Sequence, residues 1–313
     1  MLSVAKCGWY PTRRGALRGL GLLGLVAGRG ARAEAPFVVA SKSDTEGTLT
    51  GAMIAEILAR LGLPVERRLG LGPTLIVRTS LLSGEVTIYP EYTGNGAFFT
   101  ATETDPVWKS PQSAFETIRR RDAERGLVWL ERAPANNTWL IAVNGDLARR
   151  ERLATMSDFA GAVRRGLIRL AASTEFVESP AALPSFEAAY GFSLALDDII
   201  SLPGGDTAVT ARAAAQGISG VNAGMVYGTD GALSALDLTV MSDPLNAQIV
   251  YEVAPVIRAD ALARHPEIGP ALARVFATLD APTLRRLNAR ITVEGEVAEA
   301  VAARYLSENG LLP

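Results

Sequence analysis

The sequence predicts an α/β fold with two lobes, two chain crossings between them and a ligand cleft at the crossings. Strand-like runs alternate with amphipathic helical patterns along the 313 residues, which is typical of three layers around a mainly parallel sheet. A middle block carries strands of its own, and after Ser242-Asp243-Pro244 the chain returns to the first lobe. A chain that leaves one lobe, builds another and returns leaves a cleft between them.

The first element is a strand over residues 37–41, followed by a helix that ends at Gly62. Ser43 and Glu46 have the spacing of a capping box, which opens a helix. The helix itself is indicated by apolar residues at intervals of three and four: Met53, Ile54, Ile57, Leu58 and Leu61.

A second unit of strand and helix follows the first. We expect a strand over 65–69, a glycine turn over 70–73, a helix over 74–82 and a strand over 86–89. Aromatic residues, a carboxylate and a glycine turn follow over 89–96, at the carboxyl end of the strand, where α/β sheets place ligands.

The middle block repeats this alternation. Its helix over 206–216 begins with Asp206 or Thr207 as the cap. Its strands are expected over 139–143, 168–172, 199–202 and 220–227. After it come a return strand over 249–257 and a helical tail that ends at Asn309-Gly310.

These elements divide the chain after its first 33 residues. We assign residues 34–138 plus 246–313 to lobe 1 and residues 139–245 to lobe 2. The lobes are expected to close on a ligand by a hinge near 137–139 and 243–247.

Residues 1–33 have the features of a cleavable export signal. They hold six basic residues and no acid around the apolar stretch 19–27, which is too short to span a bilayer. Ala31-Arg32-Ala33 has the pattern of a cleavage site, so we expect a mature periplasmic protein that starts at Glu34. Arg13-Arg14 fits a twin-arginine signal or an ordinary basic segment, so Sec and Tat export both stay open.

Composition excludes several classes of function. A net charge of −2 disfavours a nucleic-acid partner. One cysteine and one histidine exclude a disulfide framework and a Cys/His metal cluster, and we expect no cofactor. Nucleophile motifs are absent from the sequence, and His265, the sole imidazole, falls in the helical tail. Because carboxylates are abundant, an exported hydrolase with a carboxylate pair in the cleft stays open as the alternative.

Four aromatic residues fall at the crossings and at strand ends: Tyr92, Trp139, Tyr227 and Tyr251. Each alone is explained by core packing, but together they fit a cage for a quaternary ammonium group, which rings attract through their quadrupoles. Lys42 and the helix start around Thr45 offer an ammonium and free backbone N–H groups to a ligand carboxylate. The alternative for Lys42 is a solvated surface lysine.

At these residues the mature chain resembles the osmoprotectant (glycine betaine/choline-type) substrate-binding proteins of ABC transporters, most closely the OsmF/YehZ-like branch. The resemblance is most specific over 41–47, 89–99, 133–139, 204–208 and 227–231. It implies a two-lobe periplasmic binding protein fold, type II-like, that closes on a quaternary ammonium solute and delivers it to a membrane permease. We expect a monomer that catalyses no reaction.

The same resemblance implies roles for individual residues. The cage positions are Tyr92, Trp139, Tyr227 and Tyr251, Lys42 lies on the carboxylate side, and Asn95 and Asn137 are polar pocket positions. Two positions depart from the family pattern: Ser179 replaces a frequent basic residue, and Trp139 replaces a tyrosine. Loss of the basic side chain at position 179 predicts weak glycine betaine binding or another preferred ligand. A binding lobe that signals to a membrane sensor is a third hypothesis.

Overall fold

The computed structural model describes residues 35–202 and 207–313. The predicted export signal and the predicted helix cap Asp206 lie outside these residues. Residues Ala35–Pro313 form one compact unit. Over the described ranges, no helix is both long and apolar enough to cross a membrane.

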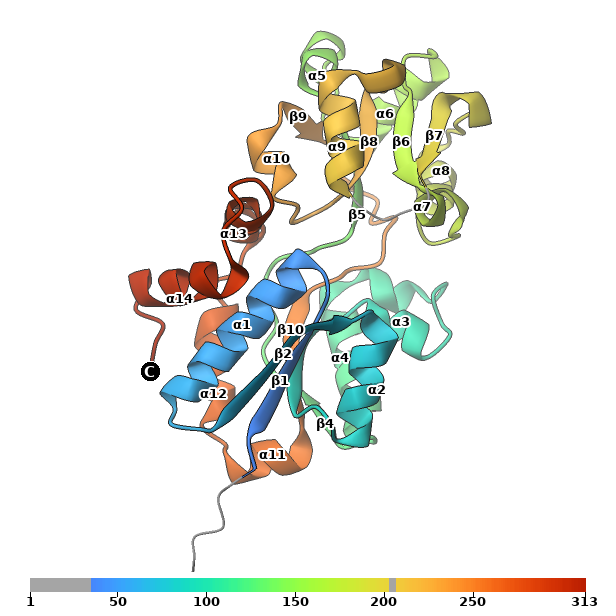
Figure 1. Cartoon of the computed structure of the whole chain (residues 1–313). Coiled ribbons are helices and arrows are strands. Elements are labelled where there is room, and N and C mark those ends of the chain that lie inside the picture. The colour runs from blue at the N-terminus through green and yellow to red at the C-terminus, as the bar shows by residue number, and fades with distance from the viewer. Residues whose placement is uncertain (1–34, 203–206) are drawn as a thin grey trace, which may run out of the picture. The chain divides into compact units, whose positions relative to one another are not determined.

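The first lobe is built on a five-stranded sheet with the strand order β2-β1-β3-β10-β4 (Figure 1). Strand β1 runs parallel to β2 and β3, whereas β10 runs antiparallel to β3 and β4. The strands are β1 (Phe37–Lys42), β2 (Val65–Gly72), β3 (Ile88–Tyr92), β4 (Leu127–Trp129) and β10 (Val253–Arg258).

Helices cover both faces of this sheet, and each face has its own apolar core. One core packs against α1 (Thr45–Arg60), α11 (Ala259–Arg264), α12 (Ile268–Phe276), α13 (Ala281–Thr292) and α14 (Ala298–Glu308). The other packs against α2 (Thr74–Ser83), α3 (Asn95–Phe99), the 3-10 turn Pro106–Lys109 and α4 (Pro111–Ala123). The buried pair Arg78–Asp122, with Trp129 donating to the same carboxylate, ties α2, α4 and β4 together.

The second lobe is built on the sheet β7-β6-β8-β5-β9. Its strands are β5 (Trp139–Asn144), β6 (Leu170–Ser173), β7 (Ile199–Leu202), β8 (Ala223–Tyr227) and β9 (Leu238–Val240). One face packs against α5 (Gly145–Glu151), α6 (Met156–Arg164), α7 (Thr174–Glu178) and α8 (Leu183–Tyr190). The other packs against α9 (Thr207–Gln216) and α10 (Ala232–Ala235).

Each sheet is mainly parallel, as predicted, but one strand in each runs opposite to the other four. In the second sheet β6 runs parallel to β7 and β8, but β5 runs antiparallel to β8 and β9. Strands β1, β3 and β8 end at the cavity between the lobes, where Lys42, Tyr92 and Tyr227 line it. The strands that follow a crossing, β5 and β10, start there and lead away, so they must oppose their neighbours.

Several predicted boundaries also need correction. Asp44, rather than Ser43, caps α1 by accepting a hydrogen bond from the Gly47 N–H, so Glu46 is no capping partner. The predicted turn over 70–73 is wrong, because β2 continues to Gly72. The last strand begins at Val253 instead of Ile249. Strand β3 extends to Tyr92, and β8 begins only at Ala223, after a 3-10 turn over Ile218–Gly220.

The two crossings run side by side. Asn136 and Glu252 form an antiparallel bridge, and the Asn137 N–H donates to the Tyr251 carbonyl at 2.9 Å. Ala247 packs in the core of the second lobe and Ile249 in that of the first. The chain therefore returns between these two residues. The domain boundaries and the hinge given above stay predictions.

Candidate ligand site between the lobes

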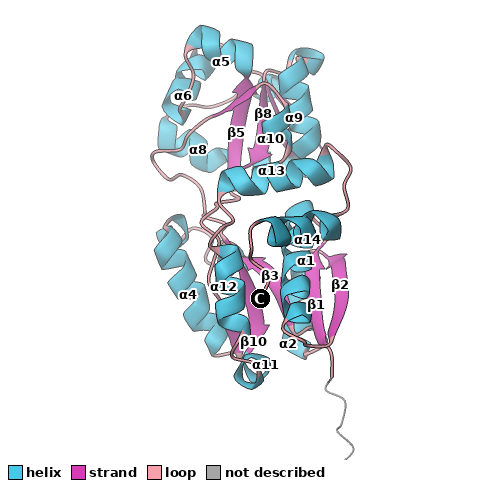
Figure 2. Cartoon of the chain, turned by 90° about the vertical axis from the view of Figure 1, so that its left-hand side faces the viewer, coloured by secondary structure: helices cyan, strands magenta, loops and turns pink. Residues whose placement is uncertain are grey.

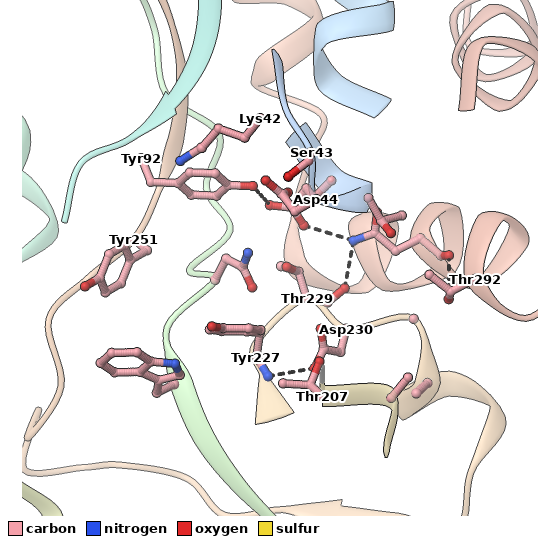
Figure 3. Close-up of a pocket in the computed structure, with 18 of the residues that line it drawn as sticks. Lys42, Ser43, Asp44, Tyr92, Thr207, Tyr227, Thr229, Asp230, Tyr251 and Thr292 are labelled. Atoms are coloured by element: carbon pink, nitrogen blue, oxygen red, sulfur yellow. Dashed lines mark hydrogen bonds between the residues drawn. The ribbon is translucent and has the colours of Figure 1, made fainter. Parts of the chain in front are cut away.

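A cavity of about 750 Å³ lies between residues of the two lobes. All eight residues singled out from the sequence line it: Lys42, Thr45, Tyr92, Asn95, Asn137, Trp139, Tyr227 and Tyr251. Figure 3 shows Lys42 and Tyr92 on one side of the cavity and Tyr227 with Thr229 on another. The structure thus brings together side chains that lie far apart in the sequence.

Three of the four aromatic residues form one wall. Trp139 begins β5 and pairs in register with Tyr227, the last residue of β8. Their rings stack with centroids 6.5 Å apart and an interplanar angle of 22°, and the Tyr251 ring lies 6.5 Å from that of Trp139. Trp139 is 7% exposed. The aromatic wall therefore combines the first residue of β5, the last residue of the antiparallel neighbour β8 and a residue of the crossing that returns to the first lobe.

Tyr92 is in the cavity but stands apart from the aromatic wall. It ends β3, and its hydroxyl donates to Oε1 of Glu46 at 2.9 Å. The Lys42 Nζ lies 4.3 Å from its ring centroid. A cation of the protein therefore already contacts the Tyr92 ring.

Lys42 is a buried residue, so the interpretation as a solvated surface lysine is wrong. Its Nζ lies 2.7 Å from Oε1 of Glu91, which is itself fully buried. Tyr89 and Asn95 also donate hydrogen bonds to the Glu91 carboxylate. Glu91 therefore balances the charge of Lys42 and fixes the Asn95 side chain.

Three residues that line the cavity carry an unpaired polar atom. Among the described residues, Asn137 Oδ1, Trp139 Nε1 and Asn288 Oδ1 are buried without a hydrogen bond of normal geometry. Burial raises the pKa values of Tyr92, Tyr227 and Tyr251. The three tyrosines therefore stay protonated near neutral pH, and their hydroxyls keep a donor.

Glu46 is the main residue that sequence reasoning missed, because its spacing from Ser43 assigned it to a helix cap. It is 4% exposed and lines the cavity, where Tyr92 and Asn288 donate to its two oxygens, each at 2.9 Å. Burial raises its pKa from 4.5 to about 7, against the lowering effect of contacts with Thr229, Tyr92 and Asn288.

The C-terminal part of the chain also reaches this site. The Asn288 Nδ2 of α13 donates both to Glu46 and to the backbone oxygen of Thr229, which follows β8. Asn288 occupies an apolar-face position next to Leu284 and Leu287, both buried. The sequence analysis missed Asn288, although a polar residue on an apolar helix face is a signal that could have marked it.

Three further expectations concern Ser179, a metal site and a pair of carboxylates. Ser179 is the C-cap of α7 and does not line it. Over the part of the chain that the structure describes, no group of three or more His, Cys, Asp or Glu side chains is placed to hold a metal ion. The carboxylates of Asp44 and Asp230 do line the cavity.

The comparisons with known proteins agree on one family. Residues 35–308 match the family model described as the substrate-binding domain of ABC-type glycine betaine transport systems. The chain is 50% identical over 281 residues to the glycine betaine-binding protein YehZ of Escherichia coli (strain K12), covering 89% of this chain and 92% of that protein.

A second relative and a solved structure extend this similarity. The chain is 31% identical over 302 residues to a glycine-betaine-binding protein of Pseudomonas aeruginosa PAO1, with 94% of each chain covered. The structure superposes on apo YehZ from Escherichia coli with a TM-score of 0.79, covering 89% of this chain and all of that one.

Proposed function

The chain belongs to the family of substrate-binding domains of ABC-type glycine betaine transport systems, and on that premise we propose that its ligand is a quaternary ammonium osmoprotectant bound in the cavity between the lobes. The observation that carries the proposal is the aromatic wall of Trp139, Tyr227 and Tyr251. A quaternary ammonium group needs no hydrogen bonds, and a buried wall of rings attracts it through the ring quadrupoles.

We assign Tyr92 to the cage and the other predicted residues, Lys42, Thr45, Asn95 and Asn137, to the polar end of the ligand. Tyr92 completes the cage across the cavity, with Lys42 beside it. Thr45 begins the 16-residue helix α1, whose first N–H groups have no partners within the helix. Asn95 and Asn137 line the same cavity.

Substrate-binding proteins of ABC importers act outside the cytoplasm and are not enzymes. For this chain we propose export with removal of residues 1–33, a monomeric mature protein and delivery of the ligand to a membrane permease. A hydrolase that uses the carboxylates of the cavity is the alternative, but the relatives found are transport proteins. Recovery of the bound ligand unchanged is expected.

The test is titration calorimetry with glycine betaine and choline on wild-type protein and three variants. Tyr227→Ala should weaken binding of both ligands by about 1–2 kcal/mol, because the cation loses a ring face. Tyr227→Phe should cost much less, since the ring remains. Tyr190→Ala is the matched control in the second lobe, because Tyr190 contacts Asp243 and does not line the cavity. Equal losses for Tyr227→Ala and Tyr227→Phe would refute the cage.

A further inference from the structure

The charged side chains that line the cavity are mostly acidic. They are Lys42, Asp44, Glu46 and Asp230, and Lys42 is paired with the buried Glu91. Among the charged residues that line the cavity, acidic residues therefore outnumber basic ones by three to one. A ligand with a net positive charge gains from such surroundings, whereas the carboxylate of a zwitterion is repelled.

Among these carboxylates, Glu46 is held in a particular way. Its partners Tyr92 and Asn288 both donate hydrogen bonds, which suits the ionised form. No Lys or Arg of the described residues forms an ion pair with it, so nothing neutralises its charge.

The other charged groups on the elements around Glu46 have partners of their own or are acidic. Asp44 caps α1, Lys42 and Glu91 pair with each other between β1 and β3, and Asp230 accepts a hydrogen bond from the Tyr227 N–H. From α13, Arg285 donates to the backbone oxygen of Gly228.

We propose that Glu46 selects ligands by charge: its ionised carboxylate makes the cavity prefer a quaternary ammonium ion with a net positive charge, such as choline, over a zwitterion such as glycine betaine. This inference rests on the proposed function and specifies the ligand class of the same site.

The proposal links ligand choice to pH. Because burial raises the pKa of Glu46 to about 7, a cation that requires the ionised form must displace a proton from part of the protein molecules at neutral pH. Neither choline nor glycine betaine titrates near pH 7 at its quaternary nitrogen. The single histidine, His265, lies outside the cavity, so it does not mimic the effect.

The experiment is titration calorimetry of choline chloride and of glycine betaine at pH 6 and pH 8. For wild-type protein, choline affinity should rise about tenfold from pH 6 to pH 8, as ionisation of one group with a pKa of about 7 requires. Glycine betaine affinity should change little or fall. Titrations in buffers of different ionisation enthalpy should show release of about half a proton per choline at pH 7.

Glu46→Gln should bind choline at pH 8 more weakly than wild type does even at pH 6, without pH dependence. Glu56→Gln is the matched control on the same helix, because Glu56 pairs with Arg60 and Arg67 outside the cavity. The proton release is measured on wild-type protein, so the test stands even where Glu46→Gln fails to fold.

Two outcomes would overturn the inference in distinguishable ways. Choline binding that is equally strong at pH 6 and pH 8 and releases no proton would refute the role of Glu46 alone. Binding of neither ligand to folded protein at either pH would refute the proposed function, and this inference with it.

Discussion

Glu46 and Lys42 carry opposite charges in one cavity and are stabilised in different ways. Lys42 faces a fully buried carboxylate 2.7 Å away, so its charge has a partner of opposite sign. Glu46 has hydrogen bonds from Tyr92 and Asn288 and a contact with Thr229, but among the described residues no Lys or Arg pairs with it. Ionising a buried carboxylate without a cation is costly. At pH 7 the site therefore holds an uncompensated negative charge in about half of the molecules, which a ligand cation relieves.

This difference predicts a pH dependence of stability. The pKa of Glu46 is about 7 in the folded protein against 4.5 in the unfolded chain. A raised folded pKa gives a stabilising contribution that is complete below pH 4.5 and is lost as the pH rises through 7. Wild type should therefore lose about 3 kcal/mol of unfolding free energy relative to Glu46→Gln between pH 4 and pH 8.

Urea denaturation of both proteins across this range measures the difference, and taking the difference cancels the other titrating groups. Glu56→Gln should track wild type at every pH, because Glu56 lies outside the cavity. A constant gap between wild type and Glu46→Gln would show that Glu46 does not titrate in this range.

At the scale of residues, the sequence predicted the cavity residues that lie at the ends of strands. Tyr92, Trp139 and Tyr227 each stand where a strand meets the cavity, so their positions followed from the alternation of elements. Glu46 and Asn288 were not predicted, because a helical residue reaches the cavity through tertiary packing. The spacing from Ser43 to Glu46 suggested a capping box and so a purely local role for Glu46. The structure rules this out, because Asp44 caps α1.

At the scale of elements, the aromatic wall depends on how α3 packs against the return crossing. A Cβ added at Gly94, directly before α3, would lie 2.7 Å from ring atoms of Tyr251 and 2.8 Å from Ile249. Only glycine allows this close approach without displacing the ring. The start of α3 therefore supports the position of Tyr251 from behind.

Gly94→Ala should weaken ligand binding several-fold, because the added methyl group pushes Tyr251, and it should lower the unfolding free energy by about 1–3 kcal/mol. Calorimetry with choline and urea denaturation measure the two effects. Gly269→Ala in α12 is the control, because its Cβ would meet nothing within 4 Å. If Gly94→Ala bound ligand as wild type does, Tyr251 would not depend on this contact.

Among the elements, those with a local signal were predicted best. Helix α1 and strand β7 lie close to the bounds that their apolar patterns predict. The turn over 70–73 and the strand start at Ile249 were wrong. Glycines Gly70 and Gly72 take positive φ values within β2. Residues 249–252 bond to the other crossing, to Trp108 and to Thr93 instead of pairing within a sheet.

At the scale of the whole molecule, the C-terminal helices join the two lobes a third time. Helix α13 belongs to the core of the first lobe, yet it packs against α10 of the second (Figure 2). The contact is close, because a Cβ at Gly231 would lie 2.4 Å from the Ala289 nitrogen. Any closure of the lobes must therefore occur around α13 as well as around the two crossings.

The two-lobe architecture was predictable because it follows from the order of elements, which the apolar patterns record. The reversed direction of β5 and β10 was not predictable. The antiparallel placement of β5 and β10 depends on where the crossings enter each sheet, a long-range property that no local pattern carries. The role of α13 was hidden for the same reason, since its sequence shows only an amphipathic helix.

The most direct test of the central claim is the crystal structure of the protein with choline or glycine betaine bound. The account predicts the quaternary nitrogen within about 6 Å of the ring centroids of Trp139, Tyr227 and Tyr251, with the polar end of the ligand toward Asn137. A ligand bound outside this cavity, or one whose quaternary ammonium group points away from the three rings, would contradict it.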